Sequence, residues 1–200
     1  MNKVMKCIIN QIPNGSRVLD LGCGDGTLLD VLIKEKNCDC YGIDINHECI
    51  LACIKKGIPV FQGNIEDGLS NFSSHVFDVI ILSQTLQQVY EPLELINSML
   101  KIGKKAIVTF PNFAHWSTRL SIIFGKIPKT KHLPYDWYNT PNIRVISIKS
   151  FRNMCKTNDI SIVKEIPLYE ESFTNSVLAP IFPNLICNKG MFLIEKQHDH

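Results

Sequence analysis

Short apolar runs alternate with amphipathic segments along the first 110 residues, and this alternation constrains the fold more than any other feature of the chain. The runs that predict strands span residues 17–21, 40–45, 58–62, 77–83 and 105–110. The helix-like segments among them span residues 27–36, 46–56 and 92–101. A strand–helix–strand rhythm is typical of a parallel sheet whose right-handed crossovers place helices on both faces.

The rest of the chain predicts one more helix, over residues 147–157, and two more strands, over 161–166 and 190–196. No helical segment long enough for a parallel crossover separates these two strands, so we expect them to pair antiparallel. The predicted fold is therefore α/β: a doubly wound, mostly parallel seven-stranded sheet of Rossmann-like type. Two hundred residues suit a single domain over 1–200.

Composition narrows the class of protein. Hydrophobic residues make up 45% of the chain and charged residues 20%, which is typical of a globular domain, and the formal net charge of +2 says little about partners. No apolar run is long enough to span a bilayer and no signal-type core follows the N-terminus, so we expect a cytoplasmic protein. Eight cysteines without a Cys-x-x-Cys pair or zinc-type spacing predict reduced, packed thiols rather than a metal site.

Residues 111–146, after the fifth predicted strand, interrupt the alternation with four prolines and both tryptophans of the chain. A long irregular insertion at the ligand side of a sheet favours a lid or a binding surface. The alternative is a loop that simply buries its aromatic rings on the domain. Between His115 and Arg152 there are seven basic residues against one acid, Asp136. The basic residues are Arg119, Lys126, Lys129, Lys131, Arg144, Lys149 and Arg152.

The glycine-rich stretch "VLDLGCGDG", residues 18–26, falls at the end of the first predicted strand. Its G-x-G-x-G spacing is neither a dinucleotide fingerprint nor a phosphate-binding P-loop. Asp20 precedes the glycines and Asp25 lies among them, so the turn repels a pyrophosphate and suits a ligand with positive charge. Asp44, at the end of the second strand, suits the two hydroxyls of a ribose. The pattern indicates a cationic nucleoside without phosphate, such as S-adenosylmethionine; the alternative is a tight turn without a ligand.

This stretch and "YGIDIN", residues 41–46, resemble two motifs of the class I S-adenosylmethionine-dependent methyltransferase superfamily. The resemblance implies a set of residues around the cofactor, from its methionine part to its adenine and its reactive centre. They are Asp20, Gly22, Cys23, Gly24, Asp44, Ile45, Asn64, Ile65, Ser83 and Gln84. Similar enzymes often carry an acid where Asn64 stands; asparagine accepts the same hydrogen bond without the charge. Cys23 also fits a simpler role, filling space beneath the turn.

Four further stretches resemble a narrower family, that of the methionine biosynthesis protein MetW. They are "VFQGNIEDGL", "FDVIILSQTLQQVYEP", "VTFPNFAHWSTRL" and "LPYDWYNTPNIR". The similarity runs from about residue 17 to about residue 163 and includes the insertion. It implies a methyltransferase-like domain linked to methionine synthesis, with homoserine O-acyltransferase as its working partner, and it establishes no methyl acceptor.

Three functions remain open at this point. The first is a methyltransferase for a small molecule, with His115 as the candidate base and Tyr135 and Tyr138 orienting the acceptor. Each of these residues has an alternative: His115 caps local backbone, and the tyrosines pack as amphipathic cover. The second is a binding module that works through the acyltransferase, with the aromatic insertion as contact surface. The third and least favoured is an RNA methyltransferase, prompted by the basic and aromatic insertion.

Overall fold

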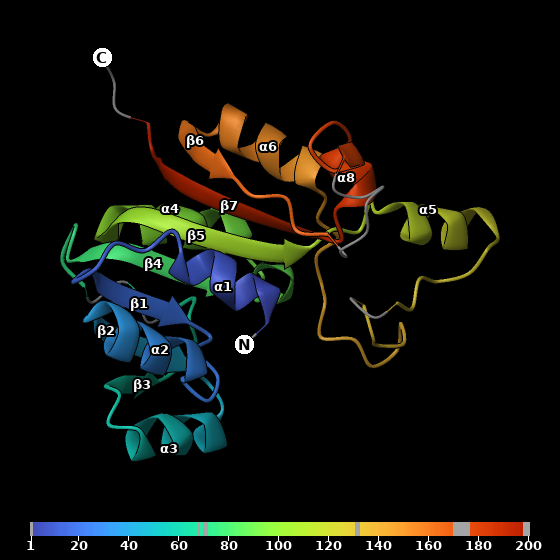
Figure 1. The fold of residues 1–200 in the computed structure, drawn as a ribbon. Coiled ribbons are helices and arrows are strands. Elements are labelled where there is room, and N and C mark those ends of the chain that lie inside the picture. Colours follow the sequence, from blue (N-terminus) through green and yellow to red (C-terminus); the bar gives the residue numbers. More distant parts are fainter. Residues whose placement is uncertain (1, 68, 70–71, 131–132, 170–176, 198–200) are drawn as a thin grey trace.

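The computed structural model describes residues 2–67, 69, 72–130, 133–169 and 177–197, and it shows one seven-stranded sheet with helices on both faces (Figure 1). The strand order is β3-β2-β1-β4-β5-β7-β6. The strands are β1 (Arg17–Leu21), β2 (Asp39–Asp44), β3 (Val60–Gln62), β4 (Phe77–Ser83), β5 (Gly103–Pro111), β6 (Ile160–Glu165) and β7 (Lys189–Lys196). This architecture confirms the predicted fold class.

Helices cover the two faces of the sheet in separate groups. The helical segments are α1 (Lys3–Ile9), α2 (Thr27–Lys36), α3 (His47–Lys55), η1 (Leu86–Gln88), α4 (Pro92–Ile102), α5 (Trp116–Ile123), α6 (Ile148–Thr157) and α8 (Pro183–Ile186). Buried side chains of α1 and α2, together with Cys53 of α3, belong to one core cluster, and those of α4 and α6 belong to the other. Among the described residues, none of the helices combines the length and the apolar character that spanning a bilayer requires.

Successive side chains of β4 point alternately into the two core clusters, which explains why this strand is apolar on both faces. Val79 and Ile81 point into the cluster beneath α1 and α2, whereas Ile80 and Leu82 point into the cluster beneath α4 and α6. All four side chains are at most 3% exposed. Burying each one stabilises the fold by roughly 1.5–3 kcal/mol, so the central strands anchor the edge on which the site is built.

The strand register brings the ends of three parallel strands together. Leu21 of β1 pairs with Ile43 of β2 on one side and with Leu82 of β4 on the other. β7 runs antiparallel to both β5 and β6, as expected for β6 and β7 from the missing crossover. Because β7 runs the opposite way, its first residue, Lys189, lies at the edge where the parallel strands end.

Predicted and observed elements differ in two ways. Every predicted strand and helix is present within about two residues of its expected bounds, but the sequence pattern missed the single turn η1 and the helices α1, α5 and α8. These helices have only seven, eight and four residues, too few to display a clear helical period. The insertion, which contains α5, extends away from the sheet beyond β5 (Figure 1). Trp116, Trp137 and Tyr138 are exposed there, so these rings are not buried on the domain.

Candidate functional site

The glycine-rich loop between β1 and α2 is held against the end of β2. The backbone amides of Gly22 and Cys23 both donate hydrogen bonds to the carbonyl of Ile43, at 2.8 and 3.1 Å. Gly22 has a φ of +76°, and a Cβ atom at this position would lie 2.9 Å from Oγ1 of Thr85. Glycine is therefore required at position 22 both for the left-handed backbone and for the close approach of the β4–η1 connection.

Asp44 connects this loop to the start of α3. Its Oδ2 accepts a hydrogen bond from the amide of Gly24 and its Oδ1 accepts one from the amide of Asn46, each at 2.8 Å. A carboxylate offers about four lone pairs, so both oxygens can accept further hydrogen bonds from a ligand. Asp44 thus has a structural role in addition to the ribose-binding role that the sequence predicts.

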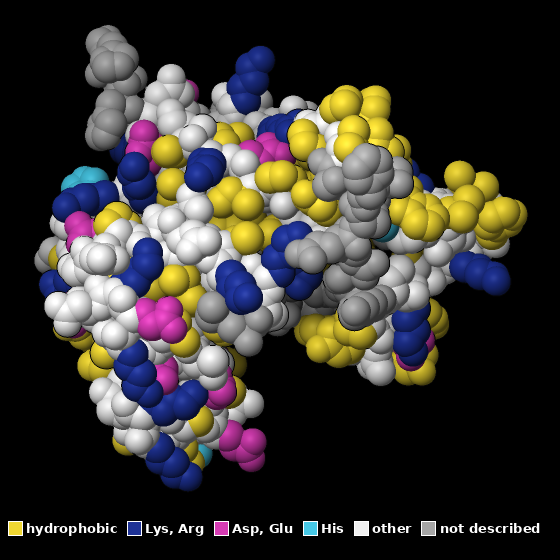
Figure 2. Space-filling model, in the orientation of Figure 1, with side chains coloured by type: hydrophobic (Ala, Val, Ile, Leu, Met, Phe, Trp, Pro, Cys, Tyr) yellow, Lys and Arg dark blue, Asp and Glu magenta, His cyan; other side chains and the backbone are white. Residues whose placement is uncertain are grey.

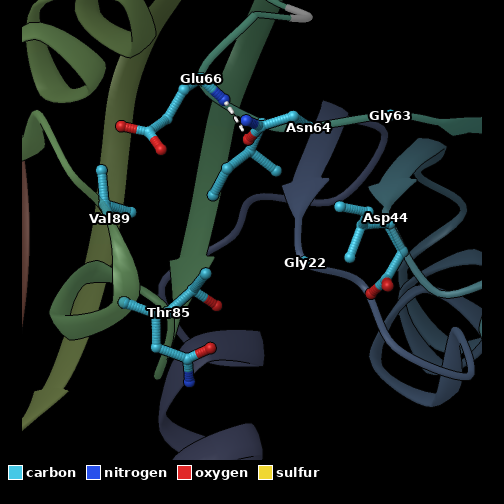
Figure 3. Close-up of a pocket in the computed structure, with 10 residues that line it drawn as sticks. Gly22, Asp44, Gly63, Asn64, Glu66, Thr85 and Val89 are labelled. Carbon is cyan, nitrogen blue, oxygen red and sulfur yellow. Dashed lines mark hydrogen bonds between the residues drawn. The ribbon is translucent and has the colours of Figure 1, made fainter. Parts of the chain in front are cut away.

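A first pocket of about 290 Å³ opens beside Asp44 (Figure 3). It is lined by Gly22, Asp44, Ile45, Gly63, Asn64, Ile65, Glu66, Thr85, Gln88 and Val89. Asp44 lies across the pocket from Thr85 and Val89 (Figure 3). Ile45 is 73% exposed although it belongs to the pocket wall, and Oδ1 of Asn64 accepts a hydrogen bond from the amide of Glu66 at 3.1 Å. The pocket combines the apolar side chains of Ile45, Ile65 and Val89 with polar groups on more than one side, which suits a nucleoside.

A second pocket of about 190 Å³ opens on the other side of the glycine-rich loop. It is lined by Asn2, Val4, Met5, Ile8, Asp20, Gly22, Cys23, Gly24, Asp25, Thr27, Leu28, Ser83, Gln84 and Lys189. The first four of these residues lie in or just before α1, which therefore forms one wall. Gly22 lines both pockets, so the two spaces adjoin across the loop.

Asp20 gives the second pocket a buried negative charge. The residue is 3% exposed, and its Oδ1 has no hydrogen-bond partner among the described residues. Burial, and next the charge of Asp44, raise the pKa of Asp20 to about 7. A cation that enters the pocket would stabilise this buried carboxylate, because its charge offsets the hydration that the carboxylate loses on burial.

Lys189 is a functional candidate that the sequence reasoning missed. Lys189 lines the same pocket as Asp20, and burial lowers the pKa of its ammonium group. No motif surrounds this lysine. The available signal was topological: once the last strand is expected to run antiparallel, its first residues lie at the carboxyl edge of the sheet.

The end of β4 is fixed by a small polar cluster around Thr109 of β5. The amide of Gln84 donates to the carbonyl and to Oγ1 of Thr109, at 2.9 and 3.0 Å, and Nε2 of Gln84 donates to the same Oγ1 at 3.0 Å. Oγ of Ser83 lies 3.2 Å from that oxygen. Gln84 has a φ of +59°, a left-handed conformation uncommon for a residue with a side chain. These bonds hold the strained turn at the base of the second pocket.

The structure brings the ten predicted cofactor residues together but separates them from the catalytic candidates. All ten line one of the two pockets, whereas His115, Tyr135 and Tyr138 line neither. His115 is the N-cap of α5, where Nδ1 accepts from the amide of Ser117 at 3.4 Å and lies 2.8 Å from its hydroxyl. Tyr135 lines a separate pocket within the insertion. Lys131, one of the seven basic residues, lies outside the described residues.

Cys23 lines the second pocket with a protonated thiol. The side chain is 7% exposed, and burial raises its pKa well above the ordinary value, which disfavours the nucleophilic thiolate. A Cβ atom on Gly42 would lie 2.5 Å from its sulfur, so the thiol packs directly on β2. All eight cysteines are free, and no metal-binding cluster occurs among the residues that the structure describes.

Comparisons with known proteins agree with this geometry. A family model described as "Methionine biosynthesis protein MetW" matches residues 3–194. A Rhodopirellula baltica protein named "Bifunctional methionine biosynthesis protein MetXA/MetW" is 35% identical over 176 residues, which are 83% of this chain but only 28% of that protein. A methyltransferase structure from Archaeoglobus fulgidus matches with a TM-score of 0.68 at 18% identity, covering 96% of this chain and 91% of that one. Another, from Mesorhizobium loti, matches with a TM-score of 0.69 at 13% identity, covering 96% of each chain. Both structures are described as S-adenosylmethionine-dependent, and at these identities they show a shared fold.

Proposed function

This chain belongs to the family of the methionine biosynthesis protein MetW, and from this premise we propose that it binds S-adenosylmethionine and supports homoserine acylation in methionine synthesis. The observation that carries the proposal is the pair of carboxylates, Asp20 and Asp44, in adjoining pockets on the two sides of one glycine-rich loop. A nucleoside fits the pocket of Asp44, and a cationic amino acid group fits that of Asp20.

The first pocket supports the adenosine end of the ligand. The free lone pairs of Asp44 accept the ribose hydroxyls, while Ile45 and Ile65 cover an adenine ring. Covering a side chain as exposed as Ile45 contributes up to roughly 1.5–3 kcal/mol. Oδ1 of Asn64 already accepts one hydrogen bond and keeps a second lone pair for the adenine amino group.

The second pocket supports the methionine end. An α-amino acid carries an ammonium and a carboxylate, and the pocket offers the opposite charges on Asp20 and Lys189. The ammonium of the ligand supplies the partner that Oδ1 of Asp20 lacks. Because both charges are desolvated, each gains more from an opposite charge than an exposed side chain would.

Binding is better supported than proton-assisted methyl transfer. A general base must come within hydrogen-bond reach of the proton that it removes. The candidate base, His115, and Tyr135, the candidate for orienting the acceptor, line pockets other than the two around the glycine-rich loop. Partner action is favoured by the Rhodopirellula relative, whose name joins MetXA and MetW in one chain. We therefore place the proposed contribution to homoserine acylation in a complex with the acyltransferase.

Calorimetric titration tests the cofactor proposal with two ligands. S-adenosylmethionine carries both ends, whereas 5′-methylthioadenosine lacks the amino acid. Lys189→Gln should weaken S-adenosylmethionine at least about 10-fold and leave methylthioadenosine unchanged, because only the first ligand has a carboxylate. Lys101→Gln, a change at an exposed lysine on α4, is the matched control and should alter neither affinity.

The cofactor proposal would be contradicted if the wild-type protein did not bind S-adenosylmethionine at millimolar concentration.

The partner proposal needs a separate test. The purified homoserine O-acyltransferase of the same organism should bind the protein, and the rate of acyl transfer should then rise. An unchanged rate together with separate elution of the two proteins would remove the role in homoserine acylation while leaving ligand binding intact.

A further inference from the structure

The insertion carries an apolar surface that the cofactor site does not use. Eleven of the twenty-one exposed large hydrophobic side chains among the described residues fall within 111–146, less than a fifth of the chain. We call this surface the insertion face. Its most prominent members are Trp116, Ile122, Ile123, Phe124, Trp137 and Val145, each at least half exposed. In Figure 2, hydrophobic side chains gather where α5 and α8 lie.

We propose that the insertion face is the surface on which the homoserine O-acyltransferase docks. This inference rests on the proposed function, which supplies the partner, and adds the place of contact. A concentration of exposed apolar side chains in one segment is typical of an interaction site, and tryptophan and tyrosine are enriched among residues that dominate binding energy. In the Rhodopirellula relative, one polypeptide chain keeps the MetXA and MetW units near each other. A specific arrangement of the two units still requires complementary surfaces.

The insertion face includes a preformed pocket for an anchoring side chain of the partner. The pocket encloses about 310 Å³ and has mainly apolar walls that include Phe113, Ile127, Leu133 and Trp137. Its lining residues do not line either pocket of the cofactor cleft, so the space is not an acceptor site next to the cofactor's methyl group. Interface anchors typically fill such desolvated pockets at the centre of a contact.

Charge at the rim defines the complementary surface further. Arg119, Lys126 and Lys149 are exposed within or beside the insertion, so the partner's surface should be apolar at its centre and acidic at its edge. Two other basic groups nearby are already paired with carboxylates. Nζ of Lys129 lies 2.8 Å from Asp136, and Nε of Arg152 lies 2.6 Å from Glu165. This pairing leaves less positive charge for RNA, whose phosphates would need it.

Binding measurements on matched variants test this placement. Phe124→Ser combined with Trp137→Ser removes two rings that are each 71% exposed, so the fold should be retained. The affinity for the acyltransferase should fall at least about 30-fold, the loss expected for one central anchor. Ile54→Ser on α3, whose side chain is 58% exposed away from the insertion, is the control and should bind normally. Affinity for S-adenosylmethionine should stay unchanged in every variant.

The possible outcomes separate this inference from the proposed function. Equal acyltransferase binding by the wild-type protein and the double variant would overturn the docking surface alone. No binding by the wild-type protein would overturn the proposed partnership and the docking surface with it. A wild-type dimer that the double variant converts to a monomer would assign the insertion face to a second copy of this chain. Ile123→Lys on α5 gives an independent check and should weaken the partner in the same way.

Discussion

Replacing Asp20 by asparagine tests the electrostatics of the cleft in the ligand-free protein. The carboxyl titrates near pH 7 in the folded state, because of burial and then Asp44, and near pH 3.8 when exposed. The folded state therefore binds more protons than the unfolded state between about pH 4 and pH 7, and stability falls as pH rises through that window. A difference of about three pKa units corresponds to about 4 kcal/mol as an upper limit.

Urea denaturation of the wild-type protein and Asp20→Asn at half-unit steps from pH 4 to pH 8 measures this effect. The wild-type free energy of unfolding should decline across the window and level off above pH 7, whereas the variant should lose less. The quantity to compare is the slope of the free energy of unfolding against pH. The absolute values also differ because the buried amide of the variant, without a full set of partners, itself costs about 1–3 kcal/mol. Parallel curves for the two proteins would refute the reasoning.

Asp25→Asn is the matched control for this experiment. Asp25 is exposed, and hydrogen bonds from the hydroxyl and amide of Thr27 lower the pKa of its carboxyl. A lowered pKa contributes stability that is present above the unfolded-state pKa and is lost as pH falls through the folded-state pKa. This change should therefore affect only the acid limb, below about pH 4.

Three further results are expected. The wild-type affinity for S-adenosylmethionine should fall by up to about 50-fold from pH 7 to pH 5, because Asp20 becomes protonated while the ligand's α-ammonium stays charged. Calorimetry on Asp20→Asn should give an affinity that does not change with pH. In the same denaturation assay, Gly22→Ala should lower the free energy of unfolding by at least about 2 kcal/mol, because the new Cβ would meet Thr85. Gly15→Ala is the control. Its φ is also positive but its surroundings are open, so the loss should be about 1 kcal/mol. Asp44→Asn should lower the free energy of unfolding by about 1–3 kcal/mol, because one of the two backbone amides that Asp44 accepts would then face an NH₂ group. In titrations the same variant should bind S-adenosylmethionine and methylthioadenosine more weakly, and to the same degree.

Much of the cleft could be predicted because parallel topology converts sequence order into proximity. Asp20 and Asp44 follow apolar runs, and the carboxyl ends of neighbouring parallel strands share one edge. The second role of Asp44, accepting the amides of Gly24 and Asn46, depends on loop geometry that no spacing reveals. Lys189 lies in the cleft only because β7 returns antiparallel beside β5.

The insertion was harder to predict, because composition does not say whether aromatic side chains face the core or the solvent. Its prolines and tryptophans mark it as exceptional, yet the same residues would suit a loop that buries its rings. Long-range contacts decide the outcome. Nδ2 of Asn112, 2% exposed, donates to the carbonyls of Cys187 and Asn184 at 2.7 and 3.1 Å, which fixes the base of the insertion.

Hydrogen bonds connect the returning arm of the insertion to the wall of the first pocket, beside Asp44. The carbonyl of Gln87 in η1 accepts hydrogen bonds from the amides of Ile143 and Arg144 at 2.9 and 3.0 Å, while the adjacent Gln88 and Val89 line the first pocket, the one proposed to hold the nucleoside. A ligand that orders η1 therefore also orders the arm that presents the insertion face. We expect S-adenosylmethionine to change the affinity for the acyltransferase, and by linkage the acyltransferase to change the affinity for S-adenosylmethionine by the same factor.

Paired titrations measure this coupling: each ligand is titrated into the protein alone and into the protein saturated with the other. Couplings carried by such a shared element are typically about 5–150-fold. Gln88→Ala, which trims the pocket wall on η1 but leaves the Gln87 carbonyl in place, should reduce the coupling more than it reduces either affinity. Equal affinities in the presence and absence of the second ligand would show that the cleft and the insertion face act independently, despite the hydrogen bonds that join them.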